Sequence, residues 1–345
     1  MKGKTILISR TDSIGDVVLT LPVAAMIKQQ LPGSRVLFLG KKYTRAVVAA
    51  CEHVDDFLDW DEVEKRGLMH QTEWLKAWQA DAILHVFPRK DIAVAAMKTG
   101  IPLRAGSTGR LWHYYTCNRL IRLSRRRSVL HEAQLNLRLL KVLGIRKFPE
   151  LQEFAELFGL SRIREADPRM KSLLLPDRFN LILHPLSKGS AREWGMDRFM
   201  ELAAMLPPER FTIFVTGSRE EGLEIRSSGI FSLRHVYDLT GRFMLDELIS
   251  FIGLADGLVA ASTGPLHLAA AMGKVAIGIY PPIKPMHPGR WAPLGKQASY
   301  LFTDKHCNDC RHSGFCHCMH DILPELVREK LEQHADRKST PSSGL

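Results

Sequence analysis

The sequence predicts an α/β protein made of two Rossmann-like, doubly wound domains in tandem. Two stretches, beginning at residues 5 and 180, share one order: apolar strand, polar loop, helix, short turn, apolar strand. Their strands are continuous apolar runs, which is typical of parallel strands covered on both faces. The chain also has 345 residues, more than the ~250 at which a single core usually stops growing.

Strands and helices are expected to alternate through the first half. Strands are predicted at residues 5–10, 35–40, 81–87 and 101–107. Helices are predicted at 17–31 and at 131–144, where Gly144 provides a stop signal. The polar stretch SRIREADPRMKS at 161–172 is the best candidate for a linker.

The second half repeats this alternation. Strands are predicted at residues 180–185, 210–217, 235–241, 257–262 and 274–280, with helices at 196–206, 244–255 and 321–335. The predicted domains are therefore 1–168 and 169–322, followed by a C-terminal helix and a disordered tail over 323–345. Small polar residues end the chain, as in many disordered tails.

The composition favours a soluble protein, with 45% hydrophobic and 25% charged residues. No apolar run approaches the ~18 residues that a bilayer crossing requires. The N-terminus, MKGKTILISR, lacks the apolar core of a signal peptide, and the six cysteines do not resemble a secreted disulfide framework. We therefore expect a cytoplasmic protein.

The charge is unevenly distributed along the chain. Residues 1–150 contain 25 Lys and Arg against 14 Asp and Glu, whereas residues 151–345 contain 23 of each. Within the first part, 101–150 holds 11 basic and 2 acidic residues. An acidic glycolipid, an anionic membrane surface or a solvated basic face would each explain this. Nucleic acid is not expected, because the segment contains no recognisable RNA- or DNA-binding module.

In open α/β sheets, ligands bind beyond the carboxyl ends of the strands. The segment GLVAASTGPLHLAAAMG places Ser262, Thr263 and Gly264 at such an end, with His267 in the first turn of the next helix. Helix N-terminal amides in this setting favour a phosphate or diphosphate. The alternative is a well-capped helix with a buried histidine.

Two other loops of the second domain could complete this site. The first carries Ser187, Lys188 and Arg192, whose charges could neutralise a diphosphate; the alternative is solvated loop charges. In the second, Gly217 and Glu220 follow the next strand. A carboxylate there could accept hydrogen bonds from a ribose, or could serve only as a helix-dipole partner.

Asp16 follows the first strand in ILISRTDSIGDVVLTLP, and Asp12 is the only other acidic residue nearby. The position suits either a helix cap or a general base that removes a proton from an attacking hydroxyl. The chain offers no P-loop, intact GxGxxG or Ser-His-Asp order to decide between them.

The C-terminal segment CNDCRHSGFCHCMH contains four closely spaced cysteines: Cys307, Cys310, Cys316 and Cys318. They could hold a structural zinc ion or could be unmetallated thiols. A catalytic zinc is not expected, because four thiolates would leave no open position.

Four motifs together carry a resemblance to a known family. RTDSIGDVVLTLP, HPLSKGSAREW, DLTGR and STGPLHLAAAMG occur in the order and spacing of glycosyltransferase family 9, the bacterial heptosyltransferases of lipopolysaccharide core assembly. The resemblance covers about residues 4–325, nearly the whole chain.

The resemblance implies a GT-B fold, in which two Rossmann-like domains face a central cleft. It implies inverting chemistry without a metal cofactor, with Asp16 as general base and ADP-heptose as the expected donor. The family's donor-binding positions fall on Ser187, Lys188, Arg192, Thr263, Gly264 and His267, to which we add Gly217, Glu220 and Ser262.

The implied acceptor is an anionic glycolipid such as the lipopolysaccharide core, reached by peripheral contact with the inner membrane. This gives the basic first half a partner, and Arg10, Arg104, Arg110 and His113 are the predicted acceptor contacts.

Ser262 is a departure from the family pattern, because many members have Asp before the Thr-Gly pair. The missing carboxylate would have accepted hydrogen bonds from hydroxyl groups of the donor sugar. Its absence leaves open a nucleotide sugar other than ADP-heptose. Two other classes of protein are the alternatives: a non-catalytic binding protein that uses the basic segment, and a nucleotide-sugar epimerase or oxidoreductase. The second class lacks its dinucleotide fingerprint here.

Overall fold

The computed structural model describes residues 3–125, 128–284, 286–305, 307 and 316–339. The chain divides into two compact units, Met1–Arg162 and Ile163–Leu345. The division falls within the stretch predicted as a linker, slightly before the predicted boundary after residue 168.

Within the described part of unit 1, parallel strands form one sheet in the order β3-β2-β1-β4-β5-β6. They are β1 (Thr5–Ser9), β2 (Arg35–Gly40), β3 (Asp56–Asp59), β4 (Ala82–His85), β5 (Leu103–Ser107) and β6 (Arg119–Ile121). This is the strand order of a Rossmann sheet, and it reverses direction between β1 and β4. A ligand is therefore expected near the carboxyl ends of these two strands.

The helices of unit 1 are α1 (Ile14–Val18), α2 (Leu21–Gln30), α3 (Arg45–Ala49), α4 (Leu68–Lys76), α5 (Lys90–Lys98), α6 (His113–Thr116) and α7 (Glu132–Leu137). The single helix predicted over 17–31 is two helices. Pro22 lies in the first turn of α2, where its missing N–H is tolerated, but it cannot continue a helix from α1. Asp16 therefore belongs to a short helix of its own.

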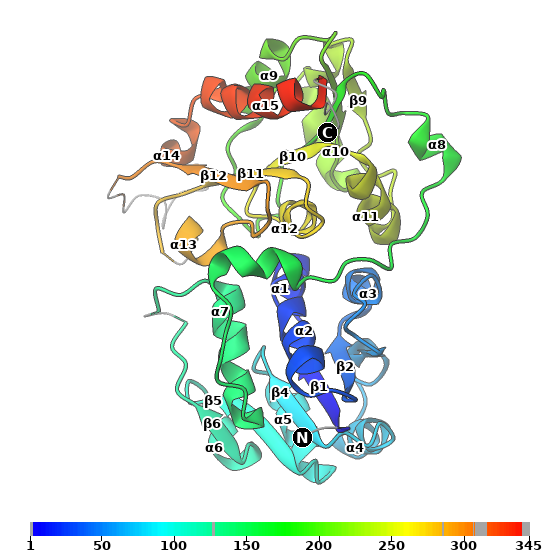
Figure 1. Cartoon of the computed structure of the whole chain (residues 1–345), viewed down its shortest axis with the longest axis vertical. Helices are drawn as coiled ribbons and strands as arrows, with labels where there is room; N and C mark the ends of the chain where they lie inside the picture. The colour runs from blue at the N-terminus through cyan, green and yellow to red at the C-terminus, as the bar shows by residue number, and fades with distance from the viewer. Residues whose placement is uncertain (1–2, 126–127, 285, 306, 308–315, 340–345) are drawn as a thin grey trace, which may run out of the picture. The chain divides into compact units, whose positions relative to one another are not determined.

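Alternate residues of the unit 1 strands bury opposite faces. Leu7, Leu37 and Ile83 share one core with α4 and α5. On the other side, α2 and α7 pack against each other (Figure 1). The helix predicted over 131–144 is α7 followed by a 3-10 segment, Arg138–Leu143, which ends at Gly144 with φ of +87°.

In the described residues of unit 2, parallel strands follow the order β12-β11-β10-β7-β8-β9. They are β7 (Phe179–His184), β8 (Phe211–Val215), β9 (Val236–Asp238), β10 (Gly257–Ala261), β11 (Val275–Tyr280) and β12 (Ala298–Phe302). The helices are α8 (Pro168–Lys171), α9 (Met196–Met205), α10 (Arg219–Ser227), α11 (Leu245–Leu254), α12 (Gly264–Ala271), α13 (Pro288–Trp291), α14 (His317–His320) and α15 (Pro324–Ser339). This is the same topology as unit 1.

Helix α15 is part of the core of unit 2. It lies beside α9 (Figure 1), and its Val327 and Leu331 are buried with Phe199 in one hydrophobic cluster. The fully buried Trp194 fixes the preceding loop by donating its indole N–H to the Ile322 carbonyl at 2.9 Å. The predicted tail over 340–345 lies outside the described residues.

None of the helices in the described residues is both long enough and apolar enough to cross a membrane.

Candidate active site

Asp16 is the third residue of α1, and its carboxylate faces the loop that precedes the helix. The N-cap of α1 is Ser13, so the interpretation of Asp16 as a cap is wrong. The Ser13 hydroxyl and the Arg10 guanidinium both donate to the Asp16 carboxylate, which is 17% exposed. Two donors on one carboxylate fix its orientation while part of it stays accessible.

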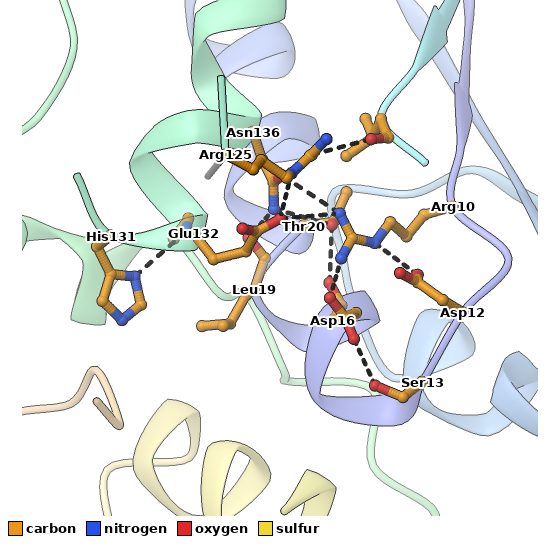
Figure 2. A network of polar contacts seen from close by, with 12 residues as sticks. Arg10, Asp12, Ser13, Asp16, Leu19, Thr20, Arg125, His131, Glu132 and Asn136 are labelled. Atoms are coloured by element: carbon orange, nitrogen blue, oxygen red, sulfur yellow. Dashed lines mark hydrogen bonds and ion pairs between the residues drawn. The ribbon is translucent and has the colours of Figure 1, made fainter. Parts of the chain in front are cut away.

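Arg10 is the centre of a buried polar network, which Figure 2 shows. Only 2% of its side chain is exposed. Its Nε donates to Asp12 at 2.6 Å, one terminal nitrogen donates to Asp16, and the other lies 3.3 Å from both Glu132 and Asn136. The sequence predicts Arg10 as an acceptor contact, but its nitrogens are instead directed at protein groups. It is a positioning residue for Asp16.

Helix α7 supports this network from the far side. Arg125 donates to Glu132 at 2.8 Å and to Asn136 at 3.1 Å. Asn136 in turn donates to the Leu19 carbonyl at 3.1 Å. The break between α1 and α2 is thereby tied to α7. Sequence reasoning missed Glu132 and Asn136; their spacing of four residues on one helix face was the available signal.

Charges in the network shift its pKa values. Burial alone would lower the pKa of Arg10, but the carboxylates of Asp12, Asp16 and Glu132 raise it above its usual value. Burial, with the nearby charge of Asp16, raises the pKa of Asp12 to about 6 despite its ion pair with Arg10. Asp12 is therefore the one other carboxylate in the described loop that merits a test as the base.

A pair of stacked histidines lies at the carboxyl ends of β4 and β5. Ser9 and His85 are direct neighbours in the β1–β4 register, and the His113 ring stacks on His85 with centroids 5.7 Å apart. His113 donates Nδ1–H to the Ser107 carbonyl at 2.9 Å. A Cβ on Gly106 would lie 2.6 Å from the His113 ring, so only glycine leaves room for it.

Both histidines are held neutral. Burial lowers the pKa of His85 to about 3 and also lowers the pKa of His113. Neither ring nitrogen of His85 has a hydrogen-bond partner within the part of the chain that the structure describes. His113, predicted as an acceptor contact, is fully buried in this structure. His113 therefore packs against His85 at the carboxyl end of β4.

Replacing His85 with glutamine should weaken the acid sensitivity of folding. A histidine with a lowered folded pKa binds its proton more readily when unfolded, so stability falls as pH drops below about 6.5 and is fully present above it. Between pH 8 and pH 5 the wild type should lose about 2 kcal/mol more than His85→Gln. Urea unfolding at both pH values measures this. Equal losses would show that His85 is protonated in the folded protein.

The other two predicted acceptor contacts differ from each other. Arg104 donates to the carbonyls of Thr116 and Ile101 at 2.8 and 2.6 Å and is held against its own strand. Arg110 is exposed, and its guanidinium lies 5.6 Å from the centroid of the Trp112 ring. Of the predicted acceptor residues, Arg110 is therefore the one with an exposed side chain in this structure.

In unit 2, the loop after β7 is held by two glutamates. The Ser187 N–H and hydroxyl both lie 2.7 Å from the Glu193 carboxylate. The Lys188 N–H donates to Glu221 at 3.0 Å, and the other oxygen of Glu221 accepts the Ser218 N–H at 2.7 Å. The Ser187 hydroxyl thus organises the loop, and Glu221 joins that loop to the start of α10.

Lys188 and Glu220 are exposed beside each other. The Lys188 side chain is 65% exposed, and its Nζ lies 3.9 Å from Glu220 Oε2. Its backbone has φ of +49°, a conformation that non-glycine residues rarely adopt. Arg192 is half-buried in the same loop. Gly217 keeps the adjacent turn narrow, since a Cβ there would lie 3.3 Å from Ile225.

Helix α12 begins beside this loop region, after β10. Thr263 is its N-cap but forms no capping hydrogen bond, and its buried hydroxyl has no partner among the described residues. Gly264 opens the helix, and His267 is buried in its first turn. Ser262 is half-buried at this end of β10, and burial raises the pKa of Tyr280, whose hydroxyl donates to the Trp291 carbonyl at 2.5 Å. Backbone N–H groups at a helix N-terminus favour an anion, and an unpartnered hydroxyl beside them can donate one more hydrogen bond.

The proposed zinc ligands are only partly covered by the structure, because Cys310 lies outside the described residues. Cys316 and Cys318 are buried in the core of unit 2, and Cys307 packs against it. In the described ranges, no three His, Cys, Asp or Glu side chains are grouped to hold a metal ion. The structural zinc remains a prediction.

Comparison with known proteins shows which family the sequence matches. Residues 119–317 match the profile of glycosyltransferase family 9 (heptosyltransferase), more than half of the chain. A Haemophilus influenzae protein, named only provisionally as a glycosyltransferase, is 26% identical over 320 residues, 90% of each chain. The lipopolysaccharide core heptosyltransferase OpsX of the same organism is 23% identical over 296 residues, 80% of this chain and 79% of its own.

Solved structures share the fold. The ADP-heptose lipopolysaccharide heptosyltransferase II of E. coli has a TM-score of 0.74 at 18% identity, covering 98% of this chain and all of that one. A family 9 glycosyltransferase from Veillonella parvula has a TM-score of 0.78 at 17% identity, covering 97% and 98%. These likenesses, with the two parallel sheets, confirm the predicted fold class: α/β, with the two Rossmann-like units of the GT-B fold.

Proposed function

Since the chain belongs to glycosyltransferase family 9 (heptosyltransferase) and is a glycosyltransferase, we propose that it transfers heptose from ADP-heptose to a lipopolysaccharide core or related cell-envelope glycan. Relatives named as lipopolysaccharide and lipooligosaccharide heptosyltransferases support this substrate class. So does the structural neighbour from E. coli, an ADP-heptose lipopolysaccharide heptosyltransferase.

Asp16 is the proposed general base. Its carboxylate takes the proton from an acceptor hydroxyl, and the oxygen attacks the anomeric carbon of the donor. The bond from that carbon to the diphosphate breaks on the opposite face, so the configuration inverts. Arg10 holds the carboxylate through a charge-assisted hydrogen bond, and Glu132 and Asn136 hold Arg10.

Unit 2 is the proposed donor-binding unit. The N-terminus of α12, with the Thr263 hydroxyl and Gly264, suits the diphosphate. Lys188 and Arg192 are proposed to neutralise the charge that develops on the leaving nucleotide, without a required metal. Glu220 is proposed to accept hydrogen bonds from the ribose. Gly217, Ser187, Ser262 and His267 complete the proposed donor set.

Unit 1 is the proposed acceptor-binding unit. Its excess of basic residues fits the phosphates and carboxylates of a core oligosaccharide. Among the predicted contacts, Arg110 has the exposure needed to meet them. A lipid-anchored acceptor would bring the enzyme to the cytoplasmic face of the inner membrane, and no nucleic acid is expected to bind.

The observation that carries this proposal is the Asp16 carboxylate, fixed by Arg10 at the carboxyl end of β1. The purified chain should add one heptose residue to a truncated core acceptor when supplied with ADP-heptose, as mass spectrometry of the product would show. GDP- and UDP-sugars belong in the same panel, because Ser262 offers a hydroxyl where the family resemblance leads us to expect a carboxylate. Transfer from one of these alone would change the donor, and no transfer from any would contradict the proposal.

A further inference from the structure

The outward face of α6 is apolar. The turn begins at Arg110, whose carbonyl accepts the His113 N–H at 3.1 Å, and Tyr114 N–H donates to the Leu111 carbonyl at 3.1 Å. Leu111, Tyr114 and Tyr115 are spaced i, i+3 and i+4 and therefore share one face. They are 84%, 59% and 57% exposed.

The inward face of the same turn is buried. His113, Thr116 and Cys117 all point into unit 1. A surface helix ordinarily buries its apolar stripe and exposes polar residues. In the turn that contains α6 the large apolar side chains are outside. The Tyr114 hydroxyl donates to the Thr108 carbonyl at 3.4 Å, but packing within unit 1 leaves the three side chains exposed.

Exposed arginines lie on the neighbouring edge strand. Arg119 and Arg122 are exposed on and just after β6, the edge strand of the sheet. The Thr108 N–H donates to the Ile121 carbonyl at 3.0 Å, which places the start of the α6 segment beside β6. Residues 108–125 contain no Asp or Glu. The surface is therefore apolar and positive at once.

Neither of the simpler explanations covers all of these residues. Charged side chains on an edge strand prevent edge-to-edge pairing, which accounts for Arg119 and Arg122 but not for exposed Leu and Tyr. A nucleic-acid surface would use the arginines but would not select an exposed leucine. A bilayer surface uses every one of these groups, since Tyr and Arg favour the headgroup region and Leu enters the acyl boundary.

We propose that Arg110, Leu111, Tyr114, Tyr115, Arg119 and Arg122 form a docking surface for a membrane that contains anionic phospholipid. The arginines bind lipid phosphates, and the three apolar side chains insert at the interface. The inference rests on the proposed function in one respect only: the identity of the membrane, which would be the one that holds the lipid-anchored acceptor.

Vesicle sedimentation of the full chain tests the surface. The wild type should bind phosphatidylcholine vesicles that contain phosphatidylglycerol, and bind pure phosphatidylcholine vesicles far less. The variant Leu111→Ser/Tyr114→Ser/Tyr115→Ser should partition about tenfold more weakly or worse. Arg119→Ser/Arg122→Ser should lose about as much, since each arginine near an anionic surface is worth about fivefold, and should show less dependence on salt.

A matched control lies on α4 of the same unit. Leu68 and Met69 are also exposed, at 41% and 77%, but follow residues 55–64, which carry six acidic side chains. Leu68→Ser/Met69→Ser should bind anionic vesicles as the wild type does. Failure of the wild type to bind, or equal losses in the control and the α6 variant, would overturn the inference.

Two further measurements distinguish membrane docking from nucleic-acid binding and from the proposed transferase activity. A random oligonucleotide that binds more tightly than the vesicles, with its binding lost in the α6 variant, would assign the surface to nucleic acid and overturn the proposal. On a lipid-free core oligosaccharide, the α6 variant should keep wild-type turnover. Vesicle binding without sugar transfer from any donor would refute the proposed function while the docking surface stands.

Discussion

Replacing Asp16 with asparagine is expected to lower turnover by about 10²–10⁴-fold, the usual contribution of a positioned general base. Asparagine keeps the size of the side chain; its Oδ1 can still accept from Arg10, and its amide nitrogen can donate to the Ser13 hydroxyl, so the local geometry should change little. It cannot take a proton from the acceptor hydroxyl. Donor affinity should be unchanged, because the proposed donor groups all belong to unit 2. Single-turnover kinetics and calorimetric titration with ADP measure the two effects.

Asp12→Asn is the matched control for this prediction. Asp12 also accepts from Arg10 and lies four residues before Asp16, in the loop that precedes α1. Its pKa is raised to about 6, within the range useful to a base. If Asp16 is the base, Asp12→Asn should reduce turnover far less than Asp16→Asn. The reverse ranking would transfer the role to Asp12, and near-normal turnover in both variants would refute base catalysis from this loop.

The sequence predicted the strands that lie inside each sheet better than those at the edges. β1 and β7 are mostly apolar runs, buried except for one partly exposed residue at an end, and both were predicted. β3, β6 and β12 were not, because these edge strands are short or partly exposed, and half of the residues in β3 (Asp56–Asp59) are charged. Period and hydrophobicity carry little signal in such segments.

The site shows the same limit in another form. Asp16 and Lys188 could be proposed from local motifs, because the loops after parallel strands are where ligands bind. The groups that hold them could not. Glu132 and Asn136 follow Arg10 by 122 and 126 residues, and Glu221 follows Lys188 by 33. Only the fold brings such partners together. A reacting residue can therefore be proposed from the sequence, whereas the residues that position it are found from the structure.

Lys188 carries the second large expected effect. Lys188→Gly should lower turnover by about 10²-fold or more, because a positive charge aimed at a leaving diphosphate acts mainly in the transition state. ADP affinity should also fall, since the ground-state diphosphate is already anionic. Lys188→Arg should recover part of the turnover, because it restores the charge with a different geometry. Steady-state kinetics and ADP titration of the three proteins measure this.

Glycine is the informative replacement at this position. Lys188 has φ of +49°, where a side chain costs about 1–2 kcal/mol that glycine does not pay. Against this, glycine gives the unfolded chain more freedom, at about 0.5–1 kcal/mol. The two effects oppose each other and leave a small gain for glycine, so Lys188→Gly should unfold at the wild-type temperature or slightly above it. A loss of activity in a protein of unchanged stability can then be assigned to the missing ammonium group.

The unusual backbone conformation of Lys188 also favours a functional role for this residue. A residue held in a rarely populated conformation persists where the surroundings fix it, and here the Lys188 N–H is fixed by Glu221. Lys171→Gly, on α8 of the same unit, removes a comparably exposed lysine that pairs only with Glu165 in the described structure, and should leave turnover unchanged. If Lys188→Gly also turned over at the wild-type rate, the ammonium would be a loop charge and the diphosphate would need its neutralising group elsewhere, with Arg192 the next candidate on the same loop.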